Sequence, residues 1–245
     1  MQAPVMADAG FAPTPPALEV RNLSGGYDDT LVLNGVTLAI GRGEILAVLG
    51  RNGMGKTTLL RTILGFLPPR AGSVFLFGRE ATGQAPDALV RSGIAYAPQE
   101  KAIFQDLSVR DNLRLAATSD HAFRDALPRI FELFPLFEHR LVQKAGTLSG
   151  GEQKMLMVAR ALMVRPRLLL IDEISEGLQP SVIAQIAAVL RSERDAGTAV
   201  LLIEQNVAFA LAIANRWAVL KRGAIDDQGT IAAGTASRIA EHFAM

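Results

Sequence analysis

Residues 45–58 read Ile-Leu-Ala-Val-Leu-Gly-Arg-Asn-Gly-Met-Gly-Lys-Thr-Thr. The five apolar residues 45–49 predict a strand that is covered on both faces of its sheet. Residues 50–57 match the pattern G-x-x-x-x-G-K-[ST], in which a glycine-rich backbone wraps a phosphate group. A helix is expected over residues 55–64, with its first N–H groups aimed at the same phosphate. The stretch therefore predicts a nucleotide site between a buried strand and a helix.

Each residue type in this loop has a chemical reason. Glycines let the backbone turn its N–H groups inward, because no Cβ stands in the way. Lys56 is able to reach the β- and γ-phosphates, and the Thr57 hydroxyl is suited to Mg²⁺. The residues predicted to bind nucleotide here are Gly50, Arg51, Asn52, Gly53, Met54, Gly55, Lys56, Thr57 and Thr58.

The remaining pattern predicts an α/β fold with a mostly parallel core sheet. Continuous apolar runs at 168–171 and 199–203 resemble the run at 45–49, and helices are expected at 149–163, 181–196 and 207–214. Alternating patterns at 18–23 and 36–40 predict an antiparallel β subdomain. Residues from about 100 to 160 predict a helical subdomain, with a helix at 122–134 that Pro128 would start late. We expect a disordered tail over 1–17 and one domain over 18–245.

Composition excludes several classes of protein. The 245 residues carry 25 basic and 24 acidic side chains, which argues against a nucleic-acid partner. There is no Cys and there are three scattered His, so neither a disulfide framework nor a zinc cluster is expected. No apolar run is long enough to span a membrane, and the N-terminus does not resemble a signal peptide. We expect an intracellular protein, or one attached to a membrane through partners.

Two carboxylates, Asp172 and Glu173, follow the apolar run at 168–171. Ligands of open α/β sheets bind at the carboxyl ends of the strands, so both residues are candidates for the site. Asp172 is predicted to hold Mg²⁺ through water. Glu173 is expected to point the other way, because strand side chains alternate, and to polarise an attacking water as general base.

Residues 148–153 read Leu-Ser-Gly-Gly-Glu-Gln and predict a second glycine-rich helix start, capped by Ser149. This hexapeptide resembles the signature of the ATP-binding-cassette (ABC) ATPases, and the order of phosphate loop, signature and acidic pair is also that of the family. The resemblance covers roughly residues 18–230. It implies an ABC cassette that hydrolyses ATP with Mg²⁺. It also implies that the signature acts across a dimer, on ATP held by the other subunit, through Ser149, Gly150, Gly151, Glu152 and Gln153.

Further positions follow from the same resemblance. Tyr27 matches the aromatic residue that stacks on adenine, and Gln99 matches the glutamine that contacts Mg²⁺ and the attacking water. Gln205 stands where the family has a switch histidine, and it is either a catalytic residue or only a helix-start residue. Ile174 replaces the usual Pro, and Gln179 replaces an Asp that helps communication across the dimer.

The stretches Gly-Arg-Asn-Gly-x-Gly-Lys, Ser-Glu-Gly-Leu-x-Pro and Ile-Glu-Gln-Asn resemble the smaller ATPase subunit of branched-chain amino-acid importers, or that of urea importers. This implies a second ABC ATPase subunit, in a homodimer or heterodimer, membrane permease subunits and, indirectly, an external solute-binding protein. It also implies a peripheral position on the cytoplasmic face of the membrane. Residues 102–104, Ala-Ile-Phe, either contact a permease helix or pack in the core. A non-transport ABC ATPase is a weaker alternative.

Overall fold

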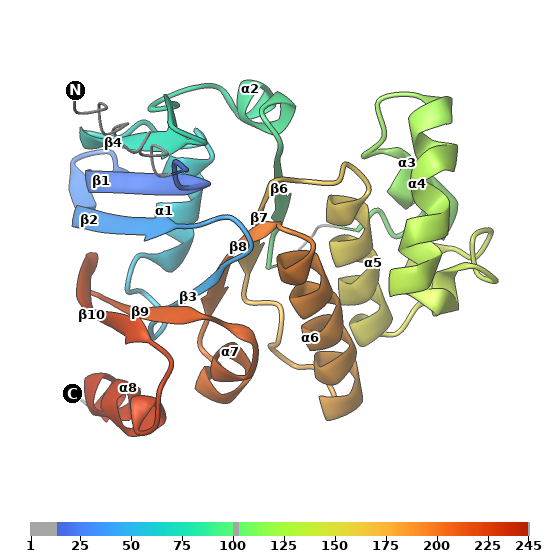
Figure 1. The fold of residues 1–245 in the computed structure, drawn as a ribbon. Helices are drawn as coiled ribbons and strands as arrows, with labels where there is room; N and C mark the ends of the chain where they lie inside the picture. The colour runs from blue at the N-terminus through green and yellow to red at the C-terminus, as the bar shows by residue number, and fades with distance from the viewer. Residues whose placement is uncertain (1–13, 100–102, 245) are drawn as a thin grey trace, which may run out of the picture.

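The computed structural model describes residues 14–99 and 103–244. Its main parts are a parallel core sheet, an antiparallel sheet beside it and a group of helices on the far side of the core (Figure 1). Within the described residues, no helix is long and apolar enough to cross a membrane.

The core sheet has six strands in the order β10-β9-β3-β8-β7-β6. Five of them are parallel, and only β10 pairs antiparallel, with β9. The three predicted buried strands are all central in it: every residue of β3, β7 and β8 is buried. The strand bounds are β3 Ile45–Leu49, β6 Ile94–Ala97, β7 Leu168–Asp172, β8 Ala199–Glu204, β9 Arg216–Lys221 and β10 Ala224–Thr230.

The second sheet is antiparallel, with the order β2-β1-β4-β5. Both strands predicted for it exist but are longer than the alternating patterns indicated, because bulges let β1 continue past its polar residues. Ala17, just before β1, is fully buried and donates its backbone N–H to the carbonyl of Ile40, so the residue ahead of Leu18 already packs with this sheet. The bounds are β1 Leu18–Tyr27, β2 Thr30–Ile40, β4 Ala71–Leu76 and β5 Arg79–Glu80.

The helices cover both faces of the core sheet. On one face, Leu59 and Leu60 pack with the antiparallel sheet against β3, β7 and β8; on the other face, Leu156 and Ile186 pack against the opposite sides of β7 and β8. The α/β fold with a mostly parallel core is therefore confirmed. The helices are α1 Lys56–Ile63, α2 Pro86–Arg91, α3 Val109–Arg114, α4 Asp120–Leu133, α5 Gly150–Leu162, α6 Pro180–Asp195, α7 Val207–Ile213 and α8 Thr235–Ala244.

Residues 103–160 contain α3, α4 and most of α5, which lie together on the right in Figure 1. The late start expected for α4 is wrong: the helix begins at Asp120, capped by Ser119, and continues through Pro128. Pro128 has no N–H to donate to the carbonyl of Arg124, and both residues are exposed, so water can satisfy that carbonyl.

Candidate functional site

The phosphate loop connects β3 to α1 and needs its glycines. A Cβ on Gly50 would lie 2.6 Å from the carbonyl oxygen of Leu220, and Gly53 and Gly55 have φ angles of 79° and 101°. Gly55 caps α1 without any side-chain hydrogen bond. The first N–H groups of a helix have no acceptor within it, so those of α1 are free to bind an anion.

Lys56 is only 4% exposed and its ammonium group is held inside the loop. It donates to the carbonyls of Gly50 and Arg51, at 2.7 and 3.0 Å, and forms an ion pair of 3.0 Å with Glu173. Thus the cation that is suited to phosphate lies beside the carboxylate predicted to act as base.

The Glu173 carboxylate also accepts two amide hydrogen bonds. Gln99 and Gln205 each donate their side-chain N–H to its second oxygen at 2.9 Å. Gln205 further donates to the Asn52 side chain at 2.6 Å. Gln205 is therefore more than a helix-start residue, since it joins the end of β8 to the phosphate loop and to Glu173. Asn206, the next residue, caps α7.

The backbone at Glu173 corrects the expected alternation. Asp172 approaches Thr57, with 3.4 Å between its Oδ2 and the hydroxyl, while Glu173 contacts Lys56. The two acidic residues therefore reach neighbouring residues of α1 instead of pointing apart. Alternation holds within a strand, but Glu173 lies one residue beyond β7 and has a left-handed φ of 46°.

Asp172 has the properties of a cation ligand. Its carboxylate is buried, and its Oδ1 has no hydrogen-bond partner among the described residues. Burial, aided by the nearby Glu173 charge, raises the pKa of Asp172 to about 6. Carboxylate and hydroxyl oxygens suit Mg²⁺, so Asp172 and Thr57 fit such an ion. The amide nitrogen of Gln99 is used by Glu173 and Glu176, which leaves its oxygen for the same purpose.

Glu204 is a site residue that the sequence reasoning missed. It is 2% exposed, and it accepts hydrogen bonds of 2.9 Å from both the backbone N–H and the hydroxyl of Ser175. It also accepts the backbone N–H of Gln205 at 3.2 Å. Burial raises its pKa. Glu204 thereby holds the loop that follows Glu173 close to Gln205, whose side chain contacts Glu173. The sequence feature that could have identified Glu204 is its position as an acidic residue at the end of the apolar run 199–203.

Tyr27 ends β1 and is 38% exposed. Its hydroxyl accepts a hydrogen bond of 3.3 Å from Arg61, which lies on α1. The ring is thus available beside the helix that follows the phosphate loop, and its stacking on adenine stays a prediction.

The signature residues lie at the exposed start of α5. The Ser149 side chain accepts the N–H of Glu152, and the Glu152 side chain accepts the N–H of Ser149 at 2.8 Å, which forms a capping box. That backbone bond is the main reason for the lowered pKa of Glu152. A Cβ on Gly150 would meet nothing within 4 Å. Within residues 14–99 and 103–244, no hydrogen bond joins residues 149–153 to the phosphate loop.

The two unusual residues of the next loop differ in their surroundings. Ile174 is fully buried and packs in the core between α5 and α6, so an apolar side chain fits there. Gln179 is exposed and precedes α6 without forming a side-chain cap.

Sequence comparisons identify the family of the chain. Residues 33–176 match the family model described as "ABC transporter". A branched-chain amino acid transport ATP-binding protein, BraG of Pseudomonas aeruginosa, is 39% identical, covering 85% of this chain and 90% of that protein. A probable protein of the same description, LivF of Archaeoglobus fulgidus, is 36% identical, covering 92% and 94%. The lipopolysaccharide export ATP-binding protein LptB of Escherichia coli is 35% identical, covering 87% and 90%.

Solved structures show the same fold. The ADP conformation of MJ1267, an ATP-binding cassette of an ABC transporter, superimposes with a TM-score of 0.86 at 25% identity, covering 94% of this chain and 99% of that one. An ATP-binding subunit of an ABC transporter superimposes with a TM-score of 0.79 at 31% identity, covering 93% of both chains. Taken with the phosphate loop, the acidic pair and the signature, these matches show that the chain belongs to the ABC transporter family and is an ATP-hydrolysing cassette.

Proposed function

We propose that this chain powers an importer of branched-chain amino acids by hydrolysing ATP at the carboxyl edge of its core sheet. The observation that carries the proposal is the environment of Glu173. Its carboxylate is held by one cation and two amides, at distances of 2.9 to 3.0 Å, beside an open glycine loop. A group held in this way is positioned before the substrate arrives.

ATP would change the partners of Lys56. Its phosphates would take the free N–H groups of α1 and draw the ammonium group away from the carbonyls of Gly50 and Arg51. Glu173 would then lose its ion pair and be free to accept a proton from the attacking water. Gln99 and Gln205 would keep the carboxylate oriented during this exchange.

We assign Asp172, Thr57 and the oxygen of Gln99 to Mg²⁺, the first of them through water. When bound there, the ion would neutralise charge on the transferring phosphoryl group. The buried, unpartnered Oδ1 of Asp172 supports this assignment, because a desolvated carboxylate oxygen needs a partner of opposite charge.

The exposed signature supports a dimeric enzyme. Its helix start is capped by Ser149 and Glu152 of the same chain, and the surface around Gly150 is open. We propose that Ser149 and its neighbours close over ATP held by a second ABC ATPase subunit. Because Gln205 is a neutral amide at any ordinary pH, we expect that subunit to differ from this chain and to carry the more active site.

We propose that the segment after Gln99 contacts a membrane permease subunit. Ala102 lies outside the described residues, whereas Ile103 packs against the helical core. Phe104 is 56% exposed, and Asn112 holds its backbone N–H and C=O, each at 3.0 Å. A fixed backbone that presents an exposed aromatic ring suits a contact with another protein.

Two relatives named for branched-chain amino acid transport support the choice of solute. LptB, named for lipopolysaccharide export, is similar at nearly the same identity, so the direction of transport needs an experiment. We would measure uptake of labelled leucine and labelled urea in cells that carry the wild-type chain or Glu173→Gln. Loss of leucine uptake alone is the expected result. Loss of urea uptake alone would point to a urea importer, and no change in either would refute the importer proposal.

A further inference from the structure

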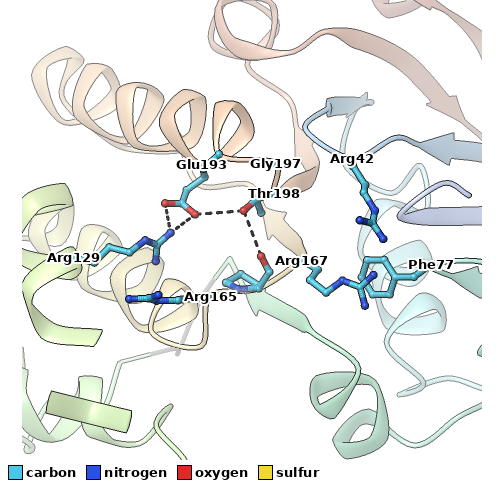
Figure 2. Close-up of a pocket in the computed structure, with 10 residues that line it drawn as sticks. Arg42, Phe77, Arg129, Arg165, Arg167, Glu193, Gly197 and Thr198 are labelled. Atoms are coloured by element: carbon cyan, nitrogen blue, oxygen red, sulfur yellow. Dashed lines mark hydrogen bonds and ion pairs between the residues drawn. The ribbon is translucent and has the colours of Figure 1, made fainter. Parts of the chain in front are cut away.

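A groove lined by four arginines lies on the core, away from the phosphate loop (Figure 2). Its volume is about 390 Å³, and Glu193 is the one acidic residue among the described residues that line it. Its arginines come from separate elements: the turn between β2 and β3, helix α4, and the connection between α5 and β7. They are Arg42, Arg129, Arg165 and Arg167. Since the whole chain is nearly neutral, this concentration of positive charge is local.

Two of the four arginines are held in place by contacts with neighbouring side chains. Arg129 forms an ion pair with the buried Glu193, and Thr198 donates its hydroxyl to the carbonyl of Pro166 at 3.3 Å. On the other side, the guanidinium of Arg167 lies 3.6 Å from the centre of the Phe77 ring, as Figure 2 shows. These contacts restrain the walls of the groove.

The other two arginines have their charges free. Arg42 and Arg165 are both exposed, and neither forms an ion pair within the part of the chain that the structure describes. Arg165 has a left-handed φ of 48°, and Arg42 precedes Gly43, whose φ is 61°. Gly43 donates its N–H to the carbonyl of Gly197 at 3.2 Å, which ties the Arg42 turn to the groove.

The groove lies at the opposite edge of the core sheet from the phosphate loop. Residues 42, 167 and 198 come just before β3, β7 and β8, and these strands are parallel, so all three residues stand at the amino ends. The phosphate loop and the acidic pair follow the carboxyl ends of β3 and β7. A nucleotide bound at the loop therefore leaves the groove free.

We propose that this groove is a second anion site, which binds a compact molecule carrying at least two phosphate groups. Guanidinium groups bind phosphate through paired hydrogen bonds, and two free guanidiniums in a restrained groove give two such positions. The ligand would bridge the connection between α5 and β7 and the turn before β3. The proposal does not depend on the solute or on the direction of transport.

Calorimetry tests the site on the purified full chain, saturated with Mg²⁺ and ADP so that the phosphate loop is occupied. The soluble probe is fructose 1,6-bisphosphate, and fructose is its uncharged control. A parallel arm measures binding to phosphatidylcholine vesicles that contain a phosphatidylinositol bisphosphate, with pure phosphatidylcholine vesicles as the control. Binding of the soluble probe assigns a free phosphate compound, whereas binding of the vesicles alone assigns a lipid headgroup.

The test variant is Arg42→Gln with Arg165→Gln, which keeps the Arg129–Glu193 pair and the Arg167–Phe77 contact. The matched control is Arg124→Gln with Lys144→Gln, which removes the same charge from exposed positions outside the groove. We expect saturable binding that falls at least about tenfold in the test variant and is unchanged in the control. Equal loss in both variants, or no saturable binding in either arm, would overturn the proposal. Unchanged ADP affinity in both variants checks that they are folded.

Discussion

Two helices, α1 and α5, have glycine-rich N-termini, and these N-termini differ in how they are capped and in what surrounds them. At α1, Gly55 provides no side-chain cap, and Lys56 is buried in contact with Glu173. At α5, the side chains of Ser149 and Glu152 accept each other's backbone N–H groups, and Gly150 faces open space. The N-terminus of α1 is enclosed by the protein and offers its N–H groups to a ligand. The N-terminus of α5 is partly capped by its own side chains and offers an open surface to another molecule.

Replacing Glu173 with Gln should produce the largest effect at the first helix start. The variant keeps the side-chain shape but removes the base, so we expect the ATPase rate to fall by about 10²–10⁴-fold while ATP binding remains. Single-turnover hydrolysis and nucleotide binding measure the two properties, and gel filtration should show an ATP-trapped dimer. A turnover rate equal to that of the wild type would sink the assignment of Glu173 as base.

Lys56→Ala should have the next largest effect, because it removes a cation aimed at the phosphates. We expect a loss of about 10²–10³-fold in ATPase rate in the assembled transporter. Lys144→Ala, which removes an exposed lysine elsewhere, is the control and should hydrolyse ATP normally. If the two variants behaved alike, the proposed role of Lys56 would be wrong.

Gly150→Asp tests the N-terminus of α5 without changing the phosphate loop at α1. The new side chain has room, so the melting temperature should stay close to that of the wild type, but its charge would repel phosphates bound by a partner subunit. We expect ATPase activity to fall about tenfold or more. Gly50→Ala is the contrast: its Cβ would lie 2.6 Å from a carbonyl oxygen, so it should lower the melting temperature. Full activity in Gly150→Asp would contradict the dimer proposal.

Gln205→Ala should have the smallest effect of the four. It removes the hydrogen bonds to Asn52 and Glu173, and because Glu173 keeps the hydrogen bond from Gln99, we expect a loss of up to about tenfold in ATPase rate. In the assembled transporter, Glu173→Gln and the equivalent change in the second ATPase can be compared. Equal losses of transport would count against a weaker site in this subunit.

The parts predicted from sequence are those with a strong local pattern. The strands β3, β7 and β8 are continuous apolar runs, and the cap of α5 is visible as Ser149. The strands β4 and β6 were missed because they are short and contain residues such as Gly72 that do not favour strands. Two further strands, β9 and β10, follow α7, and β10 continues through Gly229, which lies beside Trp217.

Sequence motifs indicated the candidate site residues one by one, but they did not indicate which of these side chains contact one another. No local pattern shows that Gln99 and Gln205 meet at Glu173, because 74 and 32 residues separate them from it. The same limit hid the bonds between Glu204 and Ser175, which are 29 residues apart. The left-handed backbone at Glu173 also gives no sequence signal, since Glu rarely adopts it.

Helix α5 has a further contact that links the two helix starts. Lys154 directly follows the exposed signature and donates its ammonium group to the backbone carbonyl of Glu173 at 3.1 Å. An α-helix rises about 1.5 Å per residue, so Ser149 and Lys154 are roughly 7.5 Å apart along one stiff rod. If a partner subunit bound the exposed N-terminus of α5 and tilted the helix, Lys154 would displace the backbone of Glu173 and with it the carboxylate. Helix α5 would thereby couple a movement of its exposed N-terminus to the position of Glu173.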